Sequence, residues 1–160
     1  MQAEMLKLKI VCVGKIKEDF FEKALAEYGK RLSRFCDFKI EEIAESRLND
    51  ETAADVARAL EEEGKSILKK ADGLAVLLDR QGVEASSFDM AKLLKSSADV
   101  KGGITFIVGS SHGVSQSVFQ RADKVISFGK ITFPHQLFRV VLAEQIYRGF
   151  TIINGSAYHK

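Results

Sequence analysis

Three short segments of the chain place glycine and polar side chains directly after apolar runs. They are residues 79–82, 109–113 and 127–135, and the apolar runs before the first two are 74–78 and 104–108. Ligands of α/β proteins gather beyond the carboxyl ends of parallel strands. If the apolar runs are such strands, these three segments are where a ligand should bind.

The segment 109–113, Gly-Ser-Ser-His-Gly, has glycine at both ends. Glycine permits a positive φ and lets a ligand approach the backbone closely, so this turn is typical of nucleotide-binding loops. It lacks the Gly-Lys-Ser/Thr ending of a P-loop and the spacing of a G-x-G-x-x-G motif. A kinase or an ordinary dinucleotide-dependent enzyme is therefore not indicated.

The same five residues also match the G-x-S-x-G pattern of a hydrolase nucleophile elbow. Asp123 and His135 follow in the chain order that a catalytic triad would need. However, the pattern is short, 160 residues is small for an α/β hydrolase, and no separate oxyanion loop is visible. A serine hydrolase that uses this turn remains a minor alternative.

The elements that must position these segments follow from the apolar pattern. The runs are continuous rather than alternating, which is typical of strands that are covered on both faces, as in a parallel sheet. Five strands are predicted, at or around 9–13, Ile40, 75–78, 104–108 and 125–126.

Apolar residues with helical spacing lie between the predicted strands. The first helix covers 20–32, Asp50 with Thr52 opens the second, Ser87 the third and Val114 or Ser115 the fourth, and Pro134 lies just inside the start of a long last helix. Strands that alternate with helices predict an α/β fold. We expect a mostly parallel sheet with helices on both faces, in a single domain of residues 1–160.

Composition limits the possible roles of the chain. With 46% hydrophobic residues, 160 residues can bury one core. No apolar run approaches the roughly 20 residues needed to cross a membrane, and no signal peptide is visible, so a soluble cytoplasmic protein is expected. Cys12 and Cys36 lack a CxxC motif or a Cys/His cluster. They are expected to be reduced core residues, with neither a disulfide nor a metal site.

The net charge of +2 is too small to make the whole molecule a binder of polyanions. Basic residues nevertheless gather near both ends: seven against four acidic ones over 9–34, and four against one over 127–160. Two interpretations stay open. These charges are ordinary solvated faces, or they form a basic surface that meets phosphates.

Several longer motifs share one family pattern. They are FIVG at 106–109 with Gly113, SFGKITFPHQL at 127–137, RVVLAEQIYR at 139–148 and YHK at 158–160. With 9–17 and 27–34 added, the chain resembles the SPOUT class of knotted methyltransferases over nearly its whole length from about Met5. It is most similar to the family of ribosomal large-subunit pseudouridine N3 methyltransferases. Ser110 stands where that family typically has glycine, Gly129 where serine is more usual, and residues 1–4 look like an extension.

The resemblance implies a C-terminal trefoil knot and S-adenosyl-L-methionine as the cofactor. It also implies that the cofactor lies in loops after three strands, where backbone groups read the adenine edge and apolar side chains surround the ring. The apolar members of this set could equally be plain core. The implied cofactor-binding residues are Leu77, Gly109, Phe128, Gly129, Lys130, Ile131, Thr132 and Phe133.

The substrate implied by the resemblance is a pseudouridine of 23S ribosomal RNA in the large subunit or the assembled ribosome. The N3 imide of that base is protonated at neutral pH, so a general base or stabilising cations should help to remove its proton. The candidate catalytic residues are His135, Arg139, Tyr158 and His159. His135 could instead stabilise the helix start. Arg139 could meet a phosphate or developing charge, and the terminal residues, expected to be frayed, could order over the RNA base.

The last helix carries more apolar side chains than one sheet face needs, among them Phe138, Val141 and Ile146. This excess predicts a homodimer that places the tail of one subunit near the cofactor of the other. Without the resemblance, buried core would explain the same residues. An RNA-binding module that has lost catalysis is the other alternative.

Overall fold

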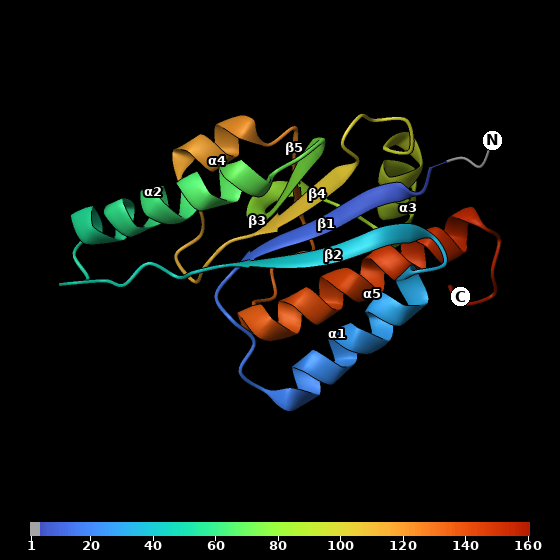
Figure 1. Ribbon diagram of the computed structural model, residues 1–160, viewed down its shortest axis with the longest axis horizontal. Helices are drawn as coiled ribbons and strands as arrows, with labels where there is room; N and C mark the ends of the chain where they lie inside the picture. The colour runs from blue at the N-terminus through green and yellow to red at the C-terminus, as the bar shows by residue number, and fades with distance from the viewer. Residues whose placement is uncertain (1–3) are drawn as a thin grey trace.

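The computed structural model describes residues 4–160 and alternates strands with helices along the chain (Figure 1). The expected N-terminal extension, residues 1–4, therefore lies outside the described residues except for Glu4. The elements are β1 (Leu6–Val13), α1 (Asp19–Leu32), β2 (Cys36–Ile43), α2 (Ala53–Lys70), β3 (Leu74–Glu84), α3 (Ser87–Ser96), β4 (Ile104–Val108), α4 (Gln116–Arg121), β5 (Lys124–Ser127) and α5 (His135–Ile153).

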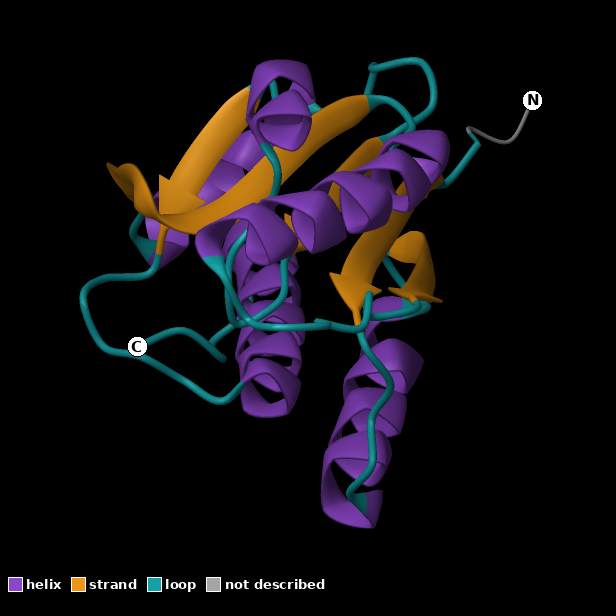
Figure 2. Cartoon of the chain, turned by 90° about the vertical axis from the view of Figure 1, so that its left-hand side faces the viewer, coloured by secondary structure: helices purple, strands orange, loops and turns teal. Residues whose placement is uncertain are grey.

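The five strands form one sheet in the order β2-β1-β4-β3-β5, and every neighbouring pair is parallel. One apolar cluster joins the sheet to α1, α3 and α5, and a second joins its other face to α2 and α4. Figure 2 shows helices on both sides of the sheet. All five residues of β4 are buried, as expected for a central strand covered on both faces. The predicted α/β class is confirmed.

Local capping explains where several helices begin. The Thr52 side chain accepts a hydrogen bond from the Asp55 amide at the start of α2, and Ser86 with Asp89 forms a capping box at α3. The third helix thus begins at Ser87, as expected, with Ser86 as its cap. Pro134 is the N-cap of α5 and lies just before the helix, one position earlier than predicted.

An irregularity in β3 shapes the carboxyl edge of the sheet. Pairing with β5 shifts register between Leu78 and Val83, so residues 79–82 bulge out of the ladder. A Cβ atom at Gly82 would lie 2.6 Å from the backbone nitrogen of Ile126, so only glycine allows β5 to pass this closely. The bulge turns 79–81 toward the space beyond the strand ends.

The last helix lies far from the edge strand that precedes it. β5 is at one edge of the sheet, whereas α5 packs against both α1 and α3. The connection 128–134 therefore crosses the carboxyl end of the sheet. The threading of the C-terminal segment into a trefoil knot stays a prediction. Within residues 4–160, no helix is long and apolar enough to cross a membrane.

Candidate functional site

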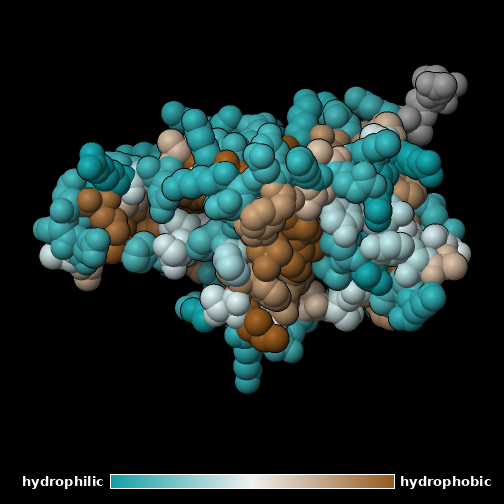
Figure 3. Space-filling view, turned by 90° about the horizontal axis from the view of Figure 1, so that it is seen from below, coloured by the Kyte–Doolittle hydropathy of each residue, from teal (hydrophilic) through white to brown (hydrophobic). Residues whose placement is uncertain are grey.

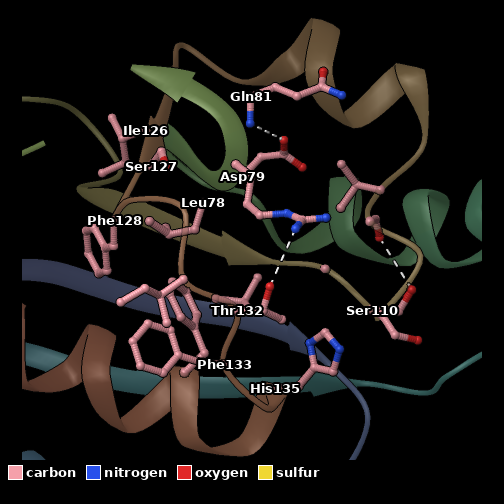
Figure 4. A pocket seen from close by; sticks show the side chains of 18 of the residues that line it. Leu78, Asp79, Gln81, Ser110, Ile126, Ser127, Phe128, Thr132, Phe133 and His135 are labelled. Atoms are coloured by element: carbon pink, nitrogen blue, oxygen red, sulfur yellow. Dashed lines mark hydrogen bonds between the residues drawn. The ribbon is translucent and has the colours of Figure 1, made fainter. Parts of the chain in front are cut away.

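A cavity of about 450 Å³ lies beyond the carboxyl ends of β3, β4 and β5 (Figure 4). The three segments singled out in the sequence meet here, because parallel strands deliver their following loops to one edge. This volume falls in the range of cofactor pockets. The lining comes from Leu78–Gln81, Val108–Val114, Ile126–Gly129, Ile131–Phe133, His135 and Phe138.

One wall of the cavity is aromatic. The ring centroid of Phe138 lies 5.6 Å from that of Phe128 and 6.2 Å from that of Phe133. Ile131 is 74% exposed although it borders the same cavity. An exposed aliphatic side chain beside an aromatic wall suits the flat apolar face of a bound ring.

Two turns present open backbone to the cavity. Gly113 has φ +90° and Gly129 has φ +108°, and a Cβ atom at either would meet nothing within 4 Å. The Ser127 hydroxyl accepts a hydrogen bond from the Gly129 amide at 3.1 Å and so holds the second turn. At the mouth, Arg80 Nη1 lies 3.5 Å from Thr132 Oγ1, which links the first and third loops. These turns leave room for a ligand to approach peptide groups.

Gly109 also borders the cavity, but for a reason that differs from the expected one. A Cβ atom there would lie 2.5 Å from the carbonyl oxygen of Gly113 and 2.6 Å from Val114 Cγ1. Glycine at 109 is therefore required by the packing of the turn itself. A larger residue would displace the loop before it blocked a ligand.

Two of the expected cofactor-binding residues, Leu77 and Lys130, are not among those that line the cavity. Leu77 is fully buried in the cluster with α2 and α4, and its neighbour Leu78 lines the cavity instead. Adjacent strand residues point to opposite faces, so the Leu77 side chain belongs to the core, and a contact of the Leu77 backbone with the cofactor stays a prediction. Lys130 is exposed and is not among the lining residues.

His135 begins α5 and lines the cavity, half-buried. Burial lowers the pKa of its imidazole, the positive charge of Arg139 lowers it further, and Glu45 opposes both effects. The ring is therefore neutral at physiological pH and able to accept a proton.

Arg139 lies elsewhere than expected. It is only 1% exposed, and its Nη2 donates to the carbonyl oxygens of Val13 and Gly14, at 2.8 Å each. Its Nη1 pairs with Glu42 Oε2 at 3.0 Å. The guanidinium thus ties α5 to the end of β1. The expectation that it meets a phosphate directly is not met in this structure, because the group is buried behind the cavity wall.

The C-terminal residues are packed rather than frayed. The Tyr158 hydroxyl donates to Glu144 Oε1 at 3.2 Å, and the Arg148 guanidinium lies 4.8 Å from the Tyr158 ring centroid. His159 Nδ1 is 3.1 Å from Arg148 Nη1. The prediction of a free tail was wrong, because α5 offers charged and aromatic partners. Glu144 and Arg148 lie nine and thirteen residues after His135, or about 14 Å and 20 Å along the helix axis, so the tail packs farther along α5 than the cavity.

The hydrolase alternative has no triad. The Asp123 carboxylate accepts hydrogen bonds from the Ala75 amide and from Arg121, at the opposite end of the sheet from His135. Within residues 4–160, Glu51 alone among non-glycine residues has a positive φ, so Ser111 lacks the strained backbone of a nucleophile elbow. The same described part of the chain holds no group of three metal-ligating side chains.

Sequence reasoning did not assign Leu78, Arg80 or Phe138 to the site. Strand alternation indicates that Leu77 and Leu78 face opposite sides of the sheet, but only the packing of the helices shows that Leu78 is the one beside the cavity. Arg80 reaches the cavity through the β3 bulge, and Phe138 through packing of α5 against the 128–134 connection. Those two contacts are tertiary.

Comparison with known proteins places this chain in a family. A family model described as "Predicted SPOUT methyltransferase" matches residues 6–159, and the chain belongs to that family. The fold is also similar to that of a probable methylase family protein from Haemophilus influenzae Rd KW20. That likeness has a TM-score of 0.56 and 12% identity, and it covers 98% of this chain and 72% of the other.

Closer relatives carry one particular name, "Ribosomal RNA large subunit methyltransferase H". The one from Caldicellulosiruptor bescii is 46% identical over 155 residues, which cover 96% of this chain and 99% of the relative. The one from Limosilactobacillus reuteri is 44% identical over 159 residues, covering 97% and 100%. The match thus spans both chains nearly end to end.

Proposed function

We propose that this protein methylates N3 of a pseudouridine in 23S ribosomal RNA of the large subunit, with S-adenosyl-L-methionine as the methyl donor. It would act in the cytoplasm as a single-domain subunit of a homodimer. The observation that carries the proposal is the cavity at the strand ends, with its two open glycine turns. It occurs in a chain that is 46% identical to a relative named "Ribosomal RNA large subunit methyltransferase H".

The cavity fits the proposed cofactor on structural grounds. Its aromatic wall and Ile131 would hold the adenine, and the open backbone at Gly113 and Gly129 leaves peptide groups free to bind the ring edge. A side chain at either glycine would fill part of that space. Gly129 thus suits the loop although serine is more usual there in the family.

The reaction needs no metal and no covalent intermediate with the protein. When bound, S-adenosyl-L-methionine supplies an electrophilic methyl group on sulfur. The aromatic wall and the turns at Gly113 and Gly129 would hold the cofactor so that this methyl group passes to N3 of the base, the electron pair of the broken C–S bond stays on sulfur, and N3 gives up its proton. The protein's contribution is to hold the nitrogen in line with the methyl group, exclude water and accept the proton.

His135 is the residue of the cavity best suited to accept that proton. It lines the cavity and its lowered pKa keeps the imidazole neutral. Arg139 acts through His135 as a positioning residue, since its charge favours the neutral ring while its own contacts fix the start of α5. Arg80 and Lys130 are exposed on the cavity loops and would meet RNA phosphates.

The tail would serve the cavity of a second subunit. Tyr158 and His159 are held on α5 by Glu144 and Arg148, about 14 Å and 20 Å from His135 along the helix axis. α5 is apolar around most of its circumference and leaves Leu137, Val140 and Val141 only half-buried. Figure 3 shows apolar surface gathered on the side of α1 and α5. A two-fold pairing of this side would cover it and bring the tail of one subunit toward its partner's cavity.

Methyl transfer from isotope-labelled S-adenosyl-L-methionine to ribosomes from cells that lack the modification tests the proposal, with nucleoside mass spectrometry to identify the product. We expect label in N3-methylpseudouridine. Calorimetry with the cofactor alone separates an enzyme from an RNA-binding module without catalysis. Absence of both binding and transfer would refute the proposal.

A further inference from the structure

A buried carboxyl group lies behind the loop 109–113, on the side away from the candidate cofactor cavity. Glu63 of α2 is 4% exposed, and its Oε2 accepts a hydrogen bond from the Ser46 amide at 2.9 Å. Its other oxygen, Oε1, is buried without a hydrogen-bond partner among residues 4–160. A buried polar atom of this kind is costly, so its retention calls for a role.

Glu63 borders a separate small cavity of about 40 Å³, together with Ser110 and His112. Ser110 and His112 also line the large cavity. The loop therefore borders both the candidate cofactor cavity and the small cavity that Glu63 lines. Burial raises the pKa of Glu63, the Ser46 amide and then the Ser110 hydroxyl lower it, Glu45 raises it and His112 lowers it. Ser110 and His112 therefore both lie within electrostatic reach of the carboxyl group.

The sequence of α2 allows this helix to lie close to the segment that follows the loop 109–113. A Cβ atom at Gly64 would lie 2.3 Å from Ser115 Oγ, so glycine there lets α2 press against the segment that follows the loop. Within the loop, Ser110 Oγ is 3.4 Å from the carbonyl oxygen of Gly113, a long contact that leaves the hydroxyl available to Glu63.

We propose that Glu63 is a positioning residue for the loop 109–113: its carboxyl fixes Ser110 from behind and so holds the cofactor-facing backbone in its binding geometry. The identity of the ligand rests on the proposed function, but the effect on the loop does not. The proposal separates the order of the loop from global stability. Removing a buried carboxyl group relieves the cost of its desolvation, whereas the loop loses the group that positions it.

The test uses Glu63→Leu, of similar size but apolar, and Glu63→Gln, which keeps an acceptor for the Ser46 amide and can donate to the Ser110 hydroxyl. Glu61→Leu, at an exposed position of the same helix, is the matched control. Hydrogen exchange of peptides covering 109–114 is measured without ligand, together with the Tm. Calorimetry then gives the Kd for S-adenosyl-L-methionine.

For Glu63→Leu we expect a Tm at or above that of the wild type and loop exchange faster by about fivefold to tenfold. The Kd should be weaker by about tenfold, because the loop would no longer be held in its binding geometry and would lose contact with the ligand equivalent to roughly one hydrogen bond. Glu63→Gln and Glu61→Leu should stay within about twofold of the wild type. A merely structural role would instead lower the Tm and speed exchange throughout the molecule.

Ser110→Ala removes the hydroxyl group that the loop offers to Glu63. If Glu63→Leu does not fold, the same measurements on Ser110→Ala test the proposal. In a double-mutant cycle, the two changes together should be no worse than the larger single change, because they break one interaction. A folded Glu63→Leu or Ser110→Ala protein with wild-type loop exchange overturns the proposal. If the wild type does not bind the cofactor, the proposed function fails, and the exchange data still decide the role of Glu63.

Discussion

Replacing Arg139 with methionine separates a positioning role from a catalytic one. The guanidinium makes two 2.8 Å hydrogen bonds to the carbonyl oxygens of Val13 and Gly14 and one ion pair with Glu42. Methionine fills similar space without donating to these groups. The change therefore removes the link between α5 and the end of β1.

The two carbonyl bonds set the size of the effect. Each hydrogen bond to a charged group contributes about 1.5–3 kcal/mol, which suggests a loss of roughly 3–6 kcal/mol. Relief of the buried charge offsets part of this loss, leaving about 2–4 kcal/mol. Glu42 is 38% exposed and regains water, so its ion pair adds little.

Urea unfolding gives this free energy, with Arg34→Met as the control because Arg34 is exposed. Methyl transfer is then measured at a temperature where both variants are folded. We expect Arg139→Met to be less stable by the stated amount and to lose activity mainly through displacement of His135. A variant as stable as the wild type that fails to methylate would refute this reasoning and restore a direct role in catalysis.

Three further predictions concern His135, the tail and the subunit interface. Nuclear magnetic resonance titration should give His135 a pKa below its ordinary value, because burial and then the charge of Arg139 lower it. Arg139→Met should raise that pKa, and an unchanged His135 pKa in this variant would argue against the coupling between the two residues. Deleting residues 158–160 should abolish methylation. It should lower the free energy of unfolding by only about 1–2 kcal/mol, which is what the contacts of Tyr158 with Glu144 and Arg148 contribute. A truncated protein with wild-type turnover would show that the tail has no role in catalysis. Val141→Glu should convert a dimer to monomers in light scattering, and a wild type that is already monomeric at micromolar concentration contradicts the shared site.

Much of the fold could be read from local pattern. The continuous apolar runs at 75–78 and 104–108 became central parallel strands, and Thr52 and Ser115 cap the helices that they were expected to open. Such features depend on neighbours within one turn or one strand, where residue type and spacing carry the information. The three loops met at one edge for the same reason, since parallel strands all end on one side.

Side-chain direction and long-range contact were decided by tertiary structure. The sequence marks 74–78 as apolar, but only the packing of two helical layers assigns Leu77 to one core cluster and Leu78 to the other, beside the cavity. It likewise marks 158–160 as a terminus, yet Glu144 and Arg148 hold it on α5.

Arg139 shows the physical reason most clearly. By itself, the sequence determined that an arginine lies one helical turn after His135 and on the same face. Only the folded chain decided that its guanidinium would be buried against the carbonyl oxygen of Val13, which lies 126 residues away. The periodicity of apolar residues indicates whether a position is buried, because burial repeats with the period of the helix or strand. The partner that covers it is set by how distant segments pack together.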